Sequence, residues 1–199
     1  MPRAGLTRDA VVDLAVRIVD ERADGFDSLT LASVASAAGV AVPSLYKHVA
    51  SLADLRAAVG LVAVRELGRR VAGAAVGISG ERALRALGHE LRAFAREHPG
   101  LFAASQAAPA VMPDDAAGLE LRRASADVVG TVAAVLRGFE LPAEREVDAI
   151  RAVRSALYGF AGLEAAGGFR MPDDVDASFE SLLDMLVAGI GALAGRPAS

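Results

Sequence analysis

Cysteine is absent from the 199-residue chain, and so is tryptophan. Without cysteine there is no disulfide framework, no thiolate nucleophile and no cysteine-ligated zinc site. Histidine is scarce, with only His48, His89 and His98. His89-Glu90 begins like a zinc-protease motif, but Ala93 stands where the second histidine is required. We therefore expect no metal and no cofactor.

Long apolar runs are also missing. The longest uninterrupted one extends from Met185 to Gly195, well short of the ~20 residues that span a membrane. The N-terminal segment carries acidic residues where a secretory signal has its apolar region. We therefore expect a cytoplasmic protein without membrane contact, and the lack of cysteine fits that reducing compartment.

Basic residues are outnumbered, since 21 Lys and Arg face 25 Asp and Glu, and the formal net charge is −4. Residues 1–50 carry five basic and six acidic side chains, so the basic footprint of a nucleic-acid-binding domain is missing from the total. Most of these acids fall on the first predicted helix or at its end. Arg3, Arg8 and Lys47, the single lysine, remain as candidates for a DNA-facing surface of weak nonspecific affinity.

The fold is predicted to be all-α, with about nine helices, because apolar residues recur every three or four positions and no sustained alternation occurs. The first helix should begin after its N-cap Thr7, bury Ala10, Leu14, Ala15 and Ile18, and stop at Gly25. Further helices are expected over residues 31–38, 43–48, 52–72, 80–98, 99–107, 114–138, 142–167 and from 173–176 to about 194.

Residues 30–49, TLASVASAAGVAVPSLYKHV, have the pattern of a helix-turn-helix: two short helices around a turn at Gly39. Six apolar residues recur at core spacing: Val34, Ala35, Ala38, Val40, Leu45 and Val49. The opposite side of the second helix would face DNA bases. His48 lies toward the bundle, where it packs, caps or reaches a phosphate. The alternative is a structural three-helix bundle without DNA contact, in which Lys47 is a solvated charge.

The segment SLTLASVASAAGVAVPSLYKHVASLADLRAAV resembles the helix-turn-helix of the TetR family of transcriptional repressors. The resemblance implies that Thr30, Tyr46 and Lys47 contact backbone phosphates and that Val42, Pro43 and Ser44 approach base edges. With His48 they make up the predicted DNA-contacting set of seven residues. Ala32 departs from the family pattern, because many relatives have an arginine there, and so does Ala41-Val42, where polar residues are common. Direct hydrogen-bond readout of bases is therefore predicted to be sparse.

The C-terminal half, from Arg154 to Leu186, looks like the WHG-type ligand-binding domain found on some of these repressors, with Tyr158 where His commonly precedes Gly-Phe. The segment 73–80 interrupts the helical pattern and marks a boundary. We therefore predict a DNA-binding domain over residues 1–52, a connecting helix and linker over 53–79, and a ligand-binding and dimerisation domain over 80–199.

In that architecture an effector cavity would be lined by eight side chains: Phe94, His98, Phe102, Gln106, Met112, Phe139, Arg154 and Tyr158. Most of them are equally compatible with plain core, and His98 with a satisfied, partly buried side chain. The last two helices would form a four-helix dimer interface through Gly159, Gly162, Phe179, Leu182, Leu183, Leu186 and Ile190. The alternative for the final helix is burial within one subunit.

The sequence as a whole predicts a homodimeric repressor that a small apolar or amphipathic effector releases from a near-palindromic double-stranded DNA operator. A rival hypothesis is a helical small-molecule binding protein whose helix-turn-helix has lost its function, which would account for Ala32 and for the missing basic excess. An enzyme is not supported. The sequence shows no nucleophile beside a base, no phosphate-cradling glycine loop and no metal cluster.

Overall fold

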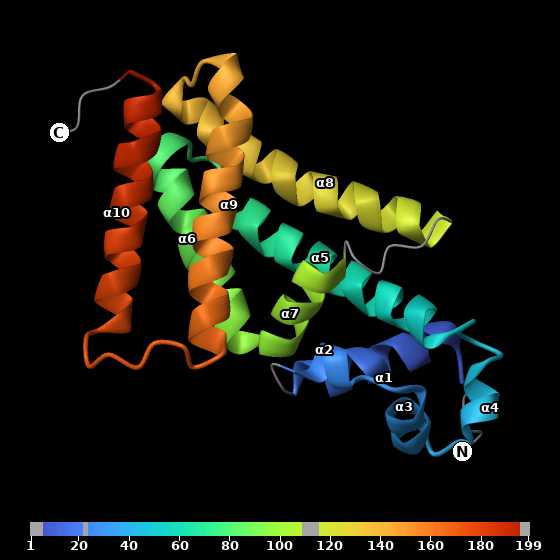
Figure 1. Ribbon diagram of the computed structural model, residues 1–199. Coiled ribbons are helices and arrows are strands. Elements are labelled where there is room, and N and C mark those ends of the chain that lie inside the picture. Colours follow the sequence, from blue (N-terminus) through green and yellow to red (C-terminus); the bar gives the residue numbers. More distant parts are fainter. Residues whose placement is uncertain (1–5, 22–23, 109–115, 196–199) are drawn as a thin grey trace. The chain divides into compact units, whose positions relative to one another are not determined.

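The computed structural model describes residues 6–21, 24–108 and 116–195, and in these ranges every regular element is a helix, as predicted (Figure 1). The elements are α1 (Arg8–Asp20), α2 (Gly25–Ser28), α3 (Leu31–Ala38), α4 (Val42–Leu45), α5 (Leu52–Ala74), α6 (Gly80–Glu97), α7 (Pro99–Ala107), α8 (Ala116–Leu136), the 3-10 turn η2 (Arg137–Phe139), α9 (Ala143–Ala165) and α10 (Val175–Leu193). Among the described residues, no helix is long and apolar enough to cross a membrane.

The helices form two compact units. The N-terminal unit comprises Met1–Glu66 with His98–Ser125, and the C-terminal unit comprises Leu67–Glu97 with Ala126–Ser199. Each unit thus combines two stretches of sequence, and α5 and α8 each contribute to both. The predicted functional boundaries after residues 52 and 79 stay a prediction.

In the N-terminal unit, α1 packs against α2, α3 and α7. Thr7 is its N-cap as predicted, with the side-chain oxygen accepting a hydrogen bond from the Ala10 amide at 3.2 Å. The buried stripe, however, is Val11, Val12, Ala15 and Val19, whereas Ala10, Leu14 and Ile18 are only half-buried. Apolar residues occupy most of the circumference of α1, so periodicity alone did not determine which stripe faces the core.

The prediction for Gly25 was wrong. The helix α1 ends at Asp20, and Gly25 opens the short helix α2, which is the element that the sequence did not predict. A Cβ at Gly25 would collide with the carbonyl oxygen of Val19 and lie 2.8 Å from the carbonyl carbon of the same residue. Glycine is therefore needed here for close approach of α2 to the end of α1.

In the C-terminal unit, α6 packs against α9, α10 and η2. Figure 1 shows α6 beside α9 and α10. Its buried stripe includes Leu84, Leu87, Leu91 and Phe94, the spacing that the sequence predicted. The helix α10 begins after Asp174, whose carboxylate accepts a hydrogen bond from the Asp176 amide at 2.8 Å. These packed helices bury the apolar surface that holds this unit together.

Gly138 lies where α6 and η2 meet backbone to backbone. A Cβ at Gly138 would collide with the Gly80 nitrogen and lie 2.7 Å from the Gly80 Cα. Gly138→Ala is expected to lower the free energy of unfolding by about 1–3 kcal/mol, as overpacking does. Gly130→Ala in α8 is the control, since a Cβ there meets nothing within 4 Å. It should stabilise by about 0.5–1 kcal/mol in urea unfolding. Equal effects of the two substitutions would contradict the contact.

Candidate nucleic-acid interface

The start of α3 is held by a reciprocal pair of hydrogen bonds between Thr30 and Ser33. The Thr30 side-chain oxygen accepts from the Ser33 amide at 3.1 Å, and the Ser33 side-chain oxygen accepts from the Thr30 amide at 3.3 Å. This capping box confirms the predicted helix start. Because the Thr30 hydroxyl oxygen serves as an acceptor, its hydrogen can be donated outward, for example to a phosphate oxygen.

The turn after α3 is the glycine turn that the sequence predicted. Gly39 has a φ of 67°, a left-handed conformation that glycine adopts without steric cost. The Gly39 amide donates to the Ser36 carbonyl at 3.1 Å, and the Val40 amide donates to the Ala35 carbonyl at 3.0 Å. These bonds satisfy the end of α3 and redirect the chain into α4.

The second helix of the motif is shorter than predicted. The helix α4 ends at Leu45, and a hydrogen-bonded turn continues to Val49, whose amide donates to the Leu45 carbonyl at 3.0 Å. Four of the six predicted core residues, Val34, Ala35, Leu45 and Val49, are buried, while Ala38 and Val40 are half-buried.

The residues predicted to contact DNA lie on the outside of the motif. Thr30, Pro43, Tyr46 and Lys47 are exposed, with 56% of the Tyr46 surface accessible, and Val42, Ser44 and His48 are half-buried. A tyrosine exposed to this extent has a large apolar ring in water and a phenol that is accessible to a partner. The structure thus leaves these side chains accessible, and whether they touch DNA stays a prediction.

The positions of the acidic residues explain much of why residues 1–50 show no basic excess in total. The sequence has no acidic residue between Asp27 and Asp54, so the whole motif carries Lys47 and no carboxylate. Of the acids nearby, Asp20 is engaged, because its carboxylate oxygen lies 2.6 Å from the His98 Nδ1. The absence of acids over residues 28–53 is visible in the sequence and is the signal that a simple count over residues 1–50 missed.

Arg8 links the end of the helix-turn-helix to α1 and to the start of α5. The Arg8 guanidinium on α1 donates to the His48 carbonyl at 3.0 Å and to both Asp54 carboxylate oxygens, at 2.8 and 2.6 Å. The Ala50 amide donates to the same carboxylate at 2.8 Å. The structure gives Arg8 this clamping role, and its predicted position on the DNA-facing surface stays a prediction. Arg3, another candidate for that surface, lies outside the described residues.

The hydrogen bond from Arg8 lowers the pKa of the Asp54 carboxyl, burial opposes it, and the Ala50 amide lowers it further. A carboxyl whose pKa is depressed on folding contributes stability above its unfolded pKa of about 4, and loses it as the pH falls through the folded pKa. Asp54→Asn should therefore lower the free energy of unfolding at pH 7 by about 1 kcal/mol, since the pair is partly exposed. The deficit should shrink below about pH 4.

This prediction is checked by urea unfolding of both proteins across that pH range. Asp148→Asn, at an exposed site on α9, is the control and should show no comparable pH-dependent deficit. A constant difference between wild type and Asp54→Asn at every pH would contradict the clamp.

The predicted effector-cavity residues divide between the two compact units, so their common cavity stays a prediction. Phe94, Phe102 and Phe139 are buried, as plain core would be, and Gln106 is exposed. In the C-terminal unit the Arg154 guanidinium lies 5.7 Å from the centre of the Tyr158 ring, and burial raises the pKa of Tyr158. Met112 lies outside the described residues.

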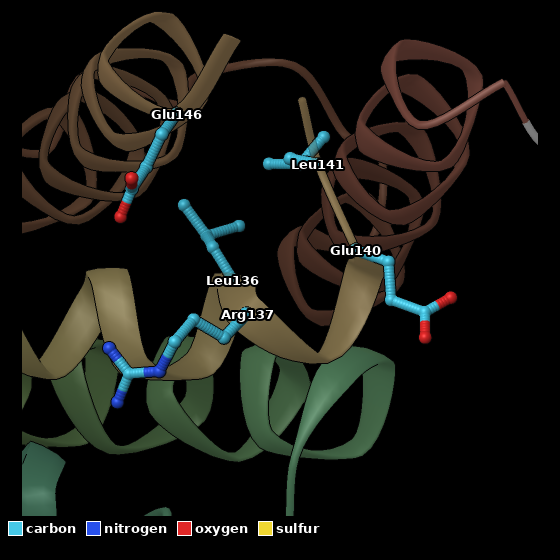
Figure 2. A pocket seen from close by; sticks show the side chains of 5 residues that line it. All are labelled: Leu136, Arg137, Glu140, Leu141 and Glu146. Carbon is cyan, nitrogen blue, oxygen red and sulfur yellow. The ribbon is translucent and has the colours of Figure 1, made fainter. Parts of the chain in front are cut away.

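A small hollow in the C-terminal unit is lined by Leu136, Arg137, Glu140, Leu141 and Glu146, none of which belongs to the predicted cavity (Figure 2). Its volume is about 120 Å³, below the 300–1,000 Å³ of typical ligand pockets. Figure 2 shows the charged ends of Arg137 and Glu140 pointing apart. These two charged groups therefore do not converge on one ligand position. In the described part of the chain, no group of three or more His, Asp and Glu side chains could hold a metal ion.

The residues predicted for a dimer interface separate into two sets. Phe179, Leu183 and Ile190 are buried within the chain itself, which is the alternative considered for the final helix. The helix α10 is apolar on more than one side, so periodicity alone could not determine which side packs against α6 and α9. Gly159, Gly162, Leu182 and Leu186 are half-buried or exposed and remain available to a partner.

Comparison with known proteins agrees with the resemblance of the helix-turn-helix. A family model described as the tetracyclin repressor-like C-terminal domain matches residues 84–186. The chain is 34% identical over 188 residues to Rv0681, an uncharacterized HTH-type transcriptional regulator of Mycobacterium tuberculosis, covering 94% of this chain and 83% of the relative. It is 28% identical to YobS, an uncharacterized HTH-type transcriptional regulator of Bacillus subtilis, over 95% of both chains.

The fold matches that of a solved structure of BioQ with its double-stranded DNA operator, with a TM-score of 0.69 at 21% identity, covering 94% of this chain and 99% of that one. The family model spans half of the sequence, and the Mycobacterium relative exceeds 30% identity over almost all of it. The chain therefore belongs to the TetR family of helix-turn-helix transcriptional regulators.

Proposed function

We propose that the protein is a cytoplasmic repressor that binds a near-palindromic operator as a homodimer and leaves it when a small effector binds. One observation carries the DNA-binding part of the proposal. In a chain of this family, the outer surface of residues 30–49 is exposed, contains Tyr46 and Lys47, and has no carboxylate. Such a surface suits a polyanion.

On this proposal the motif divides its contacts between backbone and bases. The Thr30 hydroxyl, the Tyr46 phenol and the Lys47 ammonium bind phosphates, which positions the protein on the duplex. Val42, Pro43 and Ser44 approach base edges in the major groove, and Ser44 is the only one whose side chain forms hydrogen bonds. His48 lies at the edge of this surface, where its carbonyl is already bound by Arg8.

The dimer is supported by an apolar surface on α9 and α10 that the chain itself does not cover. Leu163 and Met185 are exposed, and Leu182 and Leu186 are half-buried. A Cβ at Gly159 or Gly162 would meet nothing within 4 Å, so a partner helix has room to approach α9 closely. Packing two such helices per protomer against their copies gives an isologous interface, whose two-fold axis matches a palindromic operator.

Met185→Arg tests the dimer. Because 65% of the Met185 surface is accessible in the single chain, the substitution is expected to leave the fold intact and to place two like charges in the interface. Analytical ultracentrifugation should show a monomer at concentrations where the wild type is a dimer. The control is Val76→Arg, at an exposed residue between α5 and α6, which should stay dimeric. A dimeric Met185→Arg protein would place the interface elsewhere.

The effector is proposed to be an apolar or amphipathic small molecule that binds the predicted ligand-binding domain, residues 80–199, which contains the predicted cavity residues. It would release the operator by binding more tightly to a conformation in which the two recognition surfaces no longer match the ~34 Å repeat of successive major grooves. The helical binding protein with a non-functional helix-turn-helix remains the second candidate, favoured by Ala32, which is exposed and lacks a base-contacting side chain.

Selection of bound genomic fragments separates these candidates. Purified wild-type protein is mixed with sheared DNA of its own genome, and retained fragments are sequenced and footprinted. The repressor is expected to protect two related half-sites centred about 10 bp apart or a multiple of that, with retention that falls as salt rises. Retention of no fragment above background at low salt would favour the binding protein.

A further inference from the structure

A groove of about 430 Å³ lies wholly within the N-terminal unit, between α1, α5 and the start of α8. This volume falls in the range of small-molecule sites. The floor is apolar and includes Val12 from α1 and Leu61 and Val62 from α5, of which Val62 is 37% exposed. None of the predicted effector-cavity residues that the structure describes lines it, so we treat it as a separate site.

The rim of this groove is acidic. Asp9 and Asp13 stand one helical turn apart on α1, both are exposed, and neither has an ion-pair partner among the described residues. Glu120 on α8 completes the rim and is bound to Arg65 at 3.1 Å. Among the described residues that line the groove, the one cation is Arg8, which is bound to Asp54 and the His48 carbonyl. Over this described rim, the charge left uncompensated is therefore negative.

We propose that this groove binds an amphipathic organic cation, with its apolar body on the valine and leucine floor and its ammonium or guanidinium group between Asp9 and Asp13. An anionic amphiphile would be repelled by the same carboxylates. A bare divalent cation does not suit the site, because it needs several converging oxygen ligands. A molecule that combines one positive charge with an apolar chain satisfies both parts of the groove.

A cation bound in this groove would affect the DNA-binding surface through Arg8. The Arg8 guanidinium lines the groove and also holds the His48 carbonyl and Asp54 in place. A second positive charge beside it repels it and loosens the turn that follows α4. The cation is therefore expected to weaken operator binding. This regulatory half of the proposal rests on the proposed function, whereas the binding of the cation does not.

Isothermal titration calorimetry without DNA tests the site, with decyltrimethylammonium below its micelle concentration as the probe. Saturable binding at one site per chain is expected, and decanoate and tetramethylammonium should bind at least tenfold more weakly, because each lacks one of the two features. The Asp9→Asn, Asp13→Asn double variant should weaken binding of the probe roughly tenfold. The control variant Glu144→Gln, Asp148→Asn removes the same charge from exposed sites on α9 and should bind as the wild type does.

A second variant keeps the test decisive if the double variant is unstable. Val62→Asn alters a partly exposed floor residue and should weaken binding several-fold without loss of fold. The proposed site is wrong if decyltrimethylammonium does not bind, if decanoate binds as tightly, or if the rim and control variants bind the probe equally.

The regulatory half is tested by repeating operator binding with the groove saturated. The wild type should lose at least fivefold in affinity, and the Asp9→Asn, Asp13→Asn variant should lose little at the same probe concentration. Equal losses in both proteins would mean that the probe acts on the DNA, and no loss would mean that the groove is uncoupled; either result overturns the coupling. If the chain binds no DNA at all, the proposed function fails while calorimetry still decides the site.

Discussion

Replacement of Arg92 by alanine is expected to lower the free energy of unfolding by about 3–5 kcal/mol, the effect of breaking a buried ion pair from one side. Arg92 on α6 is only 7% exposed. Its guanidinium forms two hydrogen bonds with the Glu164 carboxylate, at 2.8 and 2.6 Å, and lies 2.6 Å from the Asp176 carboxylate. The substitution would leave the largely buried Glu164 carboxylate without this cation.

The environment of Arg92 explains why the loss should be large. The guanidinium also lies over two aromatic rings, 5.5 Å from the centre of Phe160 and 4.7 Å from the centre of Phe179, so it is packed as well as paired. Its hydrogen bond to Glu164 is the largest influence on its pKa, which is raised despite burial. Arginine keeps its charge in proteins, and this environment favours the charged form further.

Urea unfolding of two further variants isolates the cause. Arg92→Lys keeps the charge but loses the two-pronged geometry, so an intermediate loss is expected. Arg96→Ala is the matched control, because Arg96 is mostly exposed and reaches Asp176 only at 3.5 Å. It should cost about 1 kcal/mol or less. If Arg92→Ala costs no more than Arg96→Ala, the proposed role of the buried pair is wrong.

The double substitution Tyr46→Ala, Lys47→Ala is expected to weaken operator binding roughly a hundredfold or more, since a dimer would lose four phosphate contacts of about 0.5–1.5 kcal/mol each. Both side chains are exposed, so the free energy of unfolding should change little. The slope of log affinity against log salt should become shallower by about 2, because each protomer loses one cation at the phosphates.

Fluorescence anisotropy with a labelled operator, over a series of salt concentrations, measures both quantities. Arg145→Ala is the control, as it removes one positive charge from an exposed site on α9. It should leave the affinity and the salt slope unchanged. An unaltered slope in the Tyr46→Ala, Lys47→Ala protein would show that Lys47 does not neutralise a phosphate.

The helix-turn-helix could be predicted from the sequence because its geometry depends on local chemistry. The Thr30 side chain caps the helix that follows it, and Gly39 adopts the left-handed conformation that ends that helix. The stripe of α6 was equally predictable, since its polar residues leave one choice of buried side. Where capping, glycine and periodicity agree, a single sequence determines the element.

The side of a helix that packs in the core, and the contacts between residues far apart in the sequence, were not predictable in the same way. The helix α1 has apolar residues around most of its surface, and only its packing against α2, α3 and α7 selects Val11 and Val19 over Leu14 and Ile18. The clamp of Arg8 on Asp54 joins residues 46 positions apart, and nothing local distinguishes Arg8 from an arginine that faces DNA. The same limit applies to α10. Because it has several apolar sides, the sequence did not distinguish the side that packs in the core from the side that is available for a dimer interface.

One long-range feature did leave a signal. The helix α6 carries Arg85, His89, Arg92 and Arg96 at intervals of three and four, and α10 carries Asp176, Glu180 and Asp184 at intervals of four. The structure pairs these helices through contacts of Arg85 with Asp184 at 2.6 Å, His89 with Glu180 at 3.2 Å and Arg92 with Asp176 at 2.6 Å. Complementary periodic charge on two predicted helices could therefore have indicated that they are neighbours, although the prediction from the sequence did not use it.

Amide hydrogen exchange of the wild-type protein with and without its operator tests directly whether residues 30–49 form the DNA-binding surface, with a scrambled duplex of equal length as the control. Exchange over residues 42–49 and around Thr30 is expected to slow with the operator and to change little with the scrambled duplex at the same salt concentration. Tight operator binding with no protection over residues 30–49 would contradict the assignment of this surface as the DNA-binding site.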